Sequence, residues 1–193
     1  GPAQPLLNVA LLGVIAHAPE ACEVASALRK SVTNLTMPLA STETLSACPN
    51  LQSLNLSGSK ELKHLEGWLE LKKLKSVDLS GCDALENVDG LAGSPALSTV
   101  DFSECGALQN VDGLANNTKL TRVNLAGCIS IKNIDGLSNS ANLTHVQLNN
   151  CDSLMNVDGL SQSTKLTKLD FDGCYSLENI DGLSRCTKPT ALS

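Results

Sequence analysis

Aspartate followed by glycine recurs along the chain every 23 residues, and such a column of carboxylates could bind a metal or act as a general acid. The repeated aspartates are Asp89, Asp112, Asp135, Asp158 and Asp181. Calcium takes six to eight oxygen ligands, and each segment offers one Asp without a companion acid. The alternative is a turn, in which the carboxylate accepts a hydrogen bond from an N–H two or three residues on and glycine permits the bend. We expect turn capping, and a structural role for the asparagine two positions before each aspartate: Asn87, Asn110, Asn133, Asn156 and Asn179.

Cysteine forms a second column at the same spacing, consisting of Cys82, Cys105, Cys128, Cys151 and Cys174. Stacked thiols could form disulfides or bind zinc. Side chains stacked in register point the same way rather than converging, and no paired CxxC spacing is present. We therefore expect a ladder of reduced, buried thiols, with no metal and no cofactor, which favours a reducing compartment.

Catalytic and phosphate-binding motifs are missing from the sequence. His17, His64 and His145 occur in different contexts, and none pairs with Ser or Cys as in a nucleophile motif. The formal net charge of -6 and pI near 5.0 argue against a general nucleic-acid binder, because phosphate contacts need clustered Lys and Arg. We predict that the protein is not an enzyme and does not bind nucleic acid.

The elements that carry these columns follow from one repeated pattern, LxxVxLxxCxxLxNVDGLxxxxx. Its six copies begin at Leu51, Leu74, Leu97, Leu120, Leu143 and Leu166. The alternating LxxVxL half predicts a short strand, and the second half predicts a tight, 3₁₀-like outer arc. A constant period with one apolar skeleton means that each coil buries its apolar face only by stacking on its neighbours. The strands then lie side by side in a parallel sheet.

These six copies resemble the leucine-rich repeat family, whose pattern LxxLxLxxN/CxL they match from Leu51 to Lys188. The "LSGC" form is similar to repeats of plant immune receptors and of kinetoplastid leucine-rich repeat proteins, some of which are cytoskeletal. The "NVDGL" segment resembles the "DISPL" segment of bacterial internalin repeats. The resemblance implies an α/β solenoid, right-handed, with a parallel concave sheet and a convex side of short 3₁₀ turns. It also implies that the cysteine lies at the inner end of each strand and bonds to loop backbone, which an S–H group does weakly.

The flanking segments depart from the repeat. Residues 1–2 look like the scar of a tag-removing protease, which favours a fragment of a longer protein. We predict a helical N-terminal cap at 3–31, a degenerate first repeat at 32–50, six repeats at 51–188, and the start of a truncated repeat at 189–193. LLNVALLGVIA, at residues 6–16, is too short to span a membrane as a helix.

Outward positions of the strands should line the concave surface, where we expect a protein partner to bind. The candidate residues are Asp78, Asp101, Glu104, Arg122, Asn124, His145, Gln147, Asn149, Lys168, Asp170 and Asp172. Asp78 and Asp101 should be neighbours on adjacent strands, where like charges oppose pairing. A basic segment of the partner would relieve this repulsion, although a merely solvated acidic face explains the same residues.

The family resemblance implies a non-catalytic protein-interaction or scaffolding module, within a larger cytoskeletal or signalling protein in the cytoplasm. The alternative is the ligand-sensing ectodomain of a surface or immune receptor. Glycosylation sequons at Asn34, Asn55, Asn116 and Asn142 would fit that alternative, but we interpret them as accidental. A truncated last repeat would leave an open sheet edge, so we also expect self-association through the C-terminal end.

Overall fold

The computed structural model describes residues 27, 30–37, 39, 41–65, 68, 71–186 and 191–192. Most of the predicted N-terminal cap at 3–31 lies outside the described residues. The strands are β1 (Asn34–Thr36), β2 (Ser53–Asn55), β3 (Ser76–Asp78), β4 (Thr99–Asp101), β5 (Arg122–Asn124), β6 (His145–Gln147), β7 (Lys168–Asp170) and β8 (Ala191–Leu192). The 3₁₀ helices are η1 (Glu43–Ala47), η3 (Asp89–Gly93), η4 (Asp112–Leu114), η5 (Asp135–Leu137), η6 (Asp158–Leu160) and η7 (Asp181–Leu183).

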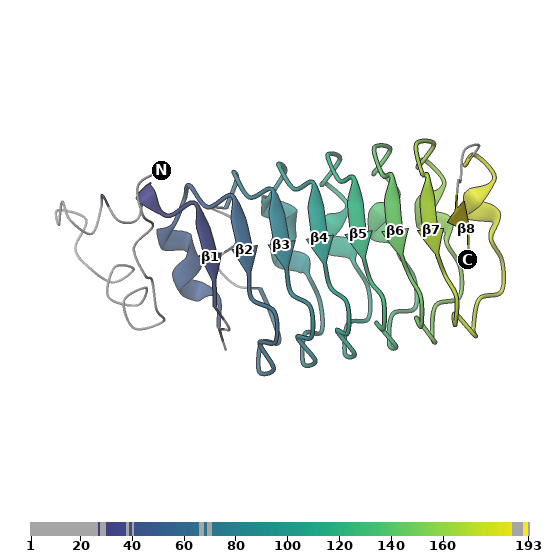
Figure 1. The fold of residues 1–193 in the computed structure, drawn as a ribbon, viewed down its shortest axis with the longest axis horizontal. Helices are drawn as coiled ribbons and strands as arrows, with labels where there is room; N and C mark the ends of the chain where they lie inside the picture. Colours follow the sequence, from purple (N-terminus) through teal and green to yellow (C-terminus); the bar gives the residue numbers. More distant parts are fainter. Residues whose placement is uncertain are drawn as a thin grey trace.

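The strands form one eight-stranded parallel sheet in sequence order, β1 to β8, so each coil contributes one strand and pairs with the coil before it (Figure 1). From β2 to β7 the partners differ by one repeat length, as in Val77↔Val100 and Val123↔Val146. β8 keeps the same offset, because Leu192 pairs with Leu169. The fold is therefore the predicted right-handed α/β solenoid, with strands on the concave face and 3₁₀ turns on the convex face.

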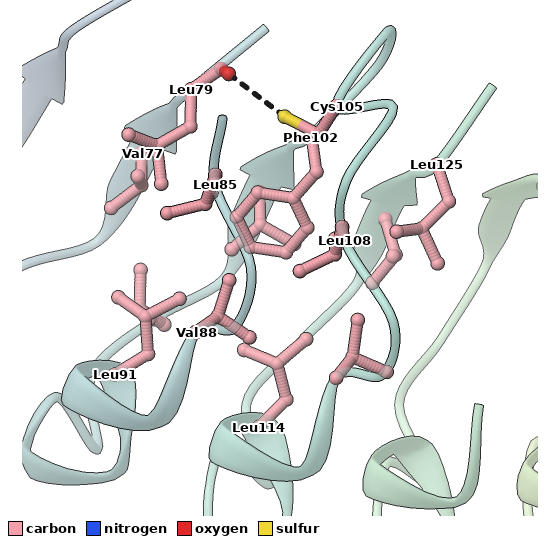
Figure 2. Close-up of a cluster of buried hydrophobic side chains, with 14 of the residues drawn as sticks. Val77, Leu79, Leu85, Val88, Leu91, Phe102, Cys105, Leu108, Leu114 and Leu125 are labelled. Carbon is pink, nitrogen blue, oxygen red and sulfur yellow. Dashed lines mark hydrogen bonds between the residues drawn. The ribbon is translucent and has the colours of Figure 1, made fainter. Parts of the chain in front are cut away.

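The core runs unbroken along the solenoid between the sheet and the 3₁₀ turns. Figure 2 shows Leu79 and Leu85 of one coil packed beside Phe102 and Leu108 of the next. Every consensus apolar position from Leu71 to Leu166 is buried, including Phe102, which is fully buried. Because the aromatic content is only 2%, this volume comes from stacked Leu, Val and Ile. The stack holds each strand, and hence each outward side chain, in fixed register.

Glycine of the Asp-Gly pair is required by the closeness of successive coils. A Cβ atom on Gly113 would collide with the carbonyl oxygen of Val88, and one on Gly136 with that of Val111. These glycines do not adopt positive φ. We expected glycine to permit an unusual backbone angle at the bend, and this explanation was wrong. Glycine is required because it has no side chain, which lets the backbones of two successive coils touch.

Candidate functional site

Strand geometry places two polar rows on the concave surface, because residues on either side of each buried central residue point outward. The first outward row consists of Ser53, Ser76, Thr99, Arg122, His145 and Lys168. The second outward row consists of Asn55, Asp78, Asp101, Asn124, Gln147 and Asp170. Eight of the eleven candidate residues lie within these rows, on β3 to β7. The sheet therefore brings the predicted side chains into one continuous surface.

The Asp78–Asp101 pair does lie on neighbouring strands in register, as predicted. Each carboxylate is already satisfied within the chain. Asp78 accepts hydrogen bonds from the N–H and the hydroxyl of Ser80 at 3.0 and 2.7 Å, and from the amide of Asn55 at 2.9 Å. Asp101 does the same with Ser103, at 2.9 and 2.6 Å, and with Asn124, at 3.0 Å. These bonds offset the repulsion without a partner.

The second outward row therefore has a structural duty that sequence reasoning missed. Its Asp or Asn accepts the N–H two residues on and so ends the strand: Asn55 binds Ser57, Asn124 binds Ala126, and Asp170 binds Asp172. The signal was present as Asp or Asn followed two positions later by a small or polar residue. Among the described residues Gln147 makes no such bond, which leaves its side chain exposed on the surface.

Glu104 and Asn150 occupy a slot that requires a left-handed backbone. Gly58, Gly81, Gly127 and Gly173 fill the same slot with φ of 71°, 66°, 74° and 75°, while Glu104 and Asn150 have φ of 60° and 61°. The Glu104 carboxylate lies over Gly127 of the next coil, and the Asn150 side-chain oxygen lies over Gly173. A left-handed Glu costs conformational energy that Gly avoids and Asn tolerates better. Glu104 is thus held in place despite strain at the edge of the predicted surface.

The cysteine ladder is present, and each thiol donates a hydrogen bond to a backbone carbonyl of the preceding coil. Cys105 reaches the oxygen of Leu79 at 3.1 Å, shown as the dashed line in Figure 2, and Cys128 reaches that of Phe102 at 3.1 Å. Burial raises the pKa of the Cys128 thiol to about 12. The five cysteines of the column form no disulfide among the described residues. The predicted hydrogen-bond role of the column is thus what the geometry provides.

Cys174 differs from the rest of its column, because it is only half-buried. Its thiol donates to Leu148 at 3.1 Å. When ionised it accepts a hydrogen bond from Cys151, which lowers the pKa of Cys174 and raises that of Cys151. The expectation that all five thiols are buried was wrong here, since no complete coil covers the outer side of the Cys174 coil among the described residues.

The Asp-Gly column does not cap the turns. The carboxylates of these aspartates are exposed, and among the residues that the structure describes they accept no hydrogen bond. The cap comes from the asparagine two positions earlier, whose side-chain oxygen accepts the aspartate N–H. These distances are 3.2 Å from Asp135 to Asn133 and 3.1 Å from Asp158 to Asn156. The predicted Asp cap was wrong, and the asparagine column performs that role.

A shallow, open depression of about 230 Å³ lies at the centre of the concave surface, over β4 to β6. It is lined by Thr99, Val100, Asp101, Arg122, Val123, Asn124, His145 and Gln147. Thr99, which was absent from the candidate residues, shares the outward row of Arg122, and that shared column could have identified it. No group of three or more His, Cys, Asp or Glu residues suited to a metal ion occurs among the described residues.

Basic side chains occupy three successive positions of the first outward row, which we call the basic row: Arg122, His145 and Lys168. Register pairs Arg122 with His145 and His145 with Lys168. Burial, and then the charges of Arg122 and Lys168, lower the pKa of the His145 imidazole. Its Nδ1 lies 2.9 Å from the hydroxyl of Thr144. His64 instead lies near Asn87, with 3.4 Å between side-chain nitrogens, so the described histidines do not converge.

The other candidate residues lie beyond the ends of the strands. Asp172 is exposed, and its carbonyl oxygen accepts the N–H of Asn150 at 2.7 Å. Asn149 has a buried side-chain oxygen for which no hydrogen-bond partner occurs among the described residues. Glu104, Asn149 and Asp172 therefore form a flank at the carboxyl ends of β4, β6 and β7, separate from the basic row at the amino ends.

Solved structures similar to this chain include two internalins and the leucine-rich repeat domain of an effector protein. Internalin F of Listeria monocytogenes matches with a TM-score of 0.65 and 17% identity over 96% of this chain, and this chain spans 62% of that structure. The functional domain of InlJ from the same organism, described as including a cysteine ladder, matches with a TM-score of 0.55 and 21% identity over 77% of this chain and 40% of its own.

The leucine-rich repeat domain of the type III effector XopL matches with a TM-score of 0.50 and 18% identity over 81% of this chain and 75% of its own. No protein-family model matches the chain, and no curated protein matches it. The fold is that of a leucine-rich repeat solenoid. Within the described residues, no helix has the length and apolar character needed to cross a membrane.

Proposed function

We propose that the chain is a non-catalytic protein-binding module that uses the concave surface over β4 to β7. The observation that carries this proposal is the unbroken register of the two outward rows, with a depression of about 230 Å³ at their centre. A rigid sheet presents these side chains in fixed positions, so little conformational entropy is lost when a partner binds. The leucine-rich repeat fold of the neighbours supports an interaction role by analogy, and the proposal rests on the concave surface because fold alone assigns no chemistry.

A matched pair of substitutions tests the face. Gln147→Trp would fill the depression, whereas Gln109→Trp places the same bulk on an exposed position between β4 and η4. Proteins captured by the wild-type chain should be lost with Gln147→Trp and retained with Gln109→Trp. Loss with Gln109→Trp alone would place the interface on another face of the solenoid.

The finer context belongs to the same proposal: a cytoplasmic scaffold, in a cytoskeletal or signalling protein with "LSGC" repeats. The five thiols of the column, none of which forms a disulfide, support a reducing compartment. A basic partner segment would meet Asp78 and Asp101, but the hydrogen bonds from Ser80, Ser103 and the asparagines weaken that argument. Location of the tagged chain in fractionated cells tests the compartment, and recovery in a membrane or secreted fraction would contradict it.

A receptor ectodomain is the second candidate, and the exposure of Asn34 and Asn116 supports it, because both sequons are open to a glycan. Asn55, by contrast, uses its side-chain amide to bind Asp78. Expression through a secretory pathway followed by glycopeptide mass spectrometry separates the candidates. Glycans at Asn34 and Asn116, together with retained solubility, would favour the receptor, and misfolding with disulfide formation would favour the cytoplasmic module.

Self-association through the C-terminal end is the remaining part of the proposal. It is supported by partly exposed apolar residues on the last coil: Phe171, Leu177, Ile180 and Leu183. Apolar rims and unpaired strand edges recruit other chains. Sedimentation over a range of concentrations tests this, and a sedimentation coefficient independent of concentration would contradict it. Ile180→Lys should reduce association, whereas Met155→Lys, on an interior coil, should leave it unchanged.

A further inference from the structure

The basic row is the only run of three basic residues on neighbouring strands in the described sheet. Arg122, His145 and Lys168 stand in register on β5, β6 and β7. Their neighbours Val123, Val146 and Leu169 are buried, so the three basic side chains are on the concave face. Adjacent strands are about 4.8 Å apart, and the row therefore spans about 10 Å.

This row lacks acidic partners within the described part of the chain. The one ion pair found there joins Lys60 and Asp83, far along the solenoid. Asp101, the nearest acid in the depression, is engaged by Ser103 and Asn124. Asp170 beside Lys168 accepts the N–H of Asp172. The lowered pKa of His145 has the same origin in part, because Arg122 and Lys168 oppose its protonation.

We propose that the basic row binds an acidic, extended segment of a partner protein, with carboxylates at alternate positions, lying across β5, β6 and β7. This inference rests on the proposed function of the concave surface and names its partner chemistry. Alternate side chains of an extended chain are about 6.7 Å apart. Two carboxylates at that spacing, centred on His145, each fall between two of the three basic groups. Successive side chains of an extended chain point to opposite sides, so the intervening side chain faces away from the sheet.

A nucleic acid is a poorer match to the same row. The chain carries a net charge of -6, and the second outward row places Asp101 and Asp170 beside the basic groups. A phosphate backbone would bring many negative charges over these acids, whereas a peptide can place carboxylates only where the basic groups are.

Protonation of His145 should couple to binding. Burial, and then the charges of Arg122 on β5 and Lys168 on β7, hold the pKa of His145 below its ordinary value, while Asp101 and Asp170 are the charged neighbours in the second row. A bound carboxylate favours the imidazolium, so the pKa is higher in the complex than in the free chain. The complex therefore takes up a proton, and affinity rises as pH falls through the pKa of the complex.

The experiment measures fluorescence anisotropy of a labelled peptide in which Glu alternates with Ser, added to the full chain. Saturable binding is expected, weakened about tenfold or more by Arg122→Gln with Lys168→Gln. The control Lys132→Gln with Arg185→Gln removes the same charge from exposed positions outside the strands and should retain binding. Affinity should rise several-fold from pH 7.5 to 6.0, and His145→Gln should abolish this rise.

Several results would overturn the proposal. These are absent binding, equal weakening in both double variants, equal affinity for a peptide with the same Glu residues in one block, and tighter binding of a single-stranded RNA. The Gln147→Trp test of the concave surface is independent of these results. Captured proteins that are lost with Gln147→Trp but kept with Arg122→Gln and Lys168→Gln would preserve the proposed function while excluding the acidic segment.

Discussion

The pentapeptide NIDGL occurs twice in this chain with different surroundings. At 133–137 it lies in an interior coil, and at 179–183 it lies in the last complete coil. Ile134 is 0% exposed, whereas Ile180 is 51% exposed. Both begin the same turn, because η5 and η7 have the same bounds relative to the pentapeptide. Identical sequence thus gives identical local structure, while burial depends on whether another coil covers it.

The difference between these two coils separates interactions that form within one coil from those that depend on a neighbouring coil. The Asn cap has the same length in both coils, 3.2 Å from Asn133 and 3.2 Å from Asn179. Apolar burial, by contrast, is shared between neighbours, as in other solenoids. At the last coil Phe171, Cys174 and Leu177 are only partly buried although their slots are fully buried elsewhere.

Thiol labelling should show the largest difference between the two regions. Cys128 is fully buried and its pKa is raised to about 12, so it should react only when the chain opens. Cys174 is half-buried with a lowered pKa, so its thiolate is present nearer neutral pH. Opening free energies of about 5 kcal/mol or more imply rates that differ over a thousandfold. Mass spectrometry of iodoacetamide-treated native protein measures both rates.

The pH dependence of thiol labelling is a control for this prediction. The thiol pKa of Cys128 is higher in the folded chain than in the unfolded chain, where it is near 9. The free energy of unfolding is therefore constant below about pH 9 and decreases as pH rises above that value. Cys128 labelling should therefore accelerate above about pH 9, and Cys128→Ala should remove part of the alkaline loss of stability. Equal labelling rates for Cys128 and Cys174 in native protein would contradict the difference between interior and terminal coils.

Truncation of the two isoleucines should show the next largest effect. Ile134→Ala removes a fully buried side chain and leaves a cavity, so it should lower the free energy of unfolding by about 2–5 kcal/mol. Ile180→Ala should lower it by under about 1 kcal/mol, because half of that side chain is already in water. Urea denaturation of both variants measures the difference. Equal losses would mean that something covers the last coil in solution.

The repeat could be read from the sequence, and with it the strands, the sheet order and the cysteine ladder. A fixed period forces identical residues into stacked columns, so the column of Cys128 predicts its own neighbours. The roles within a turn could not be read in this way. Asp135 and Asn133 are both able to accept an N–H, and only the backbone path decides that Asn133 does so. The collision of a Gly136 side chain with Val111 likewise depends on how closely two coils approach.

On the concave surface, too, the sequence predicts some features and not others. Register alone placed Asp78 beside Asp101, as the sequence predicted, and the same register places Arg122 beside His145. Whether a charge is free to bind a partner depended on side-chain hydrogen bonds that no column reveals. Ser80 engages Asp78, whereas no described acid pairs with Arg122.

Removing the asparagine cap should lower the free energy of unfolding by an intermediate amount. The loss should be the same in the interior coil and in the last coil. Asn133→Ala and Asn179→Ala each remove one acceptor for an N–H, which costs about 0.5–2 kcal/mol. Asp135→Ala should change the free energy of unfolding by under about 0.5 kcal/mol, because its carboxylate is exposed. A large loss with Asp135→Ala, or a calcium-dependent rise in melting temperature that this variant lacks, would restore a role for the carboxylate.

The smallest expected effect compares the two non-glycine residues in the left-handed slot. Glu104 has φ of 60° and Asn150 has φ of 61°. A left-handed conformation costs most residues about 1–2 kcal/mol, while Gly costs about 0.5–1 kcal/mol in lost unfolded-state freedom. Glu104→Gly should therefore stabilise the chain by under about 1 kcal/mol. Asn150→Gly should leave stability nearly unchanged, since Asn adopts this conformation more readily than Glu.

Both residues lie on interior coils, so the contrast isolates the backbone from burial. Glu104 also places its carboxylate over Gly127, at the edge of the predicted binding surface. Strain kept at one position is common where a side chain serves binding. Thermal and urea denaturation of the two variants tests the expectation. A destabilised Glu104→Gly variant would mean that contacts of the carboxylate with the next coil outweigh the strain, and Glu104 would then be a structural residue rather than a strained one.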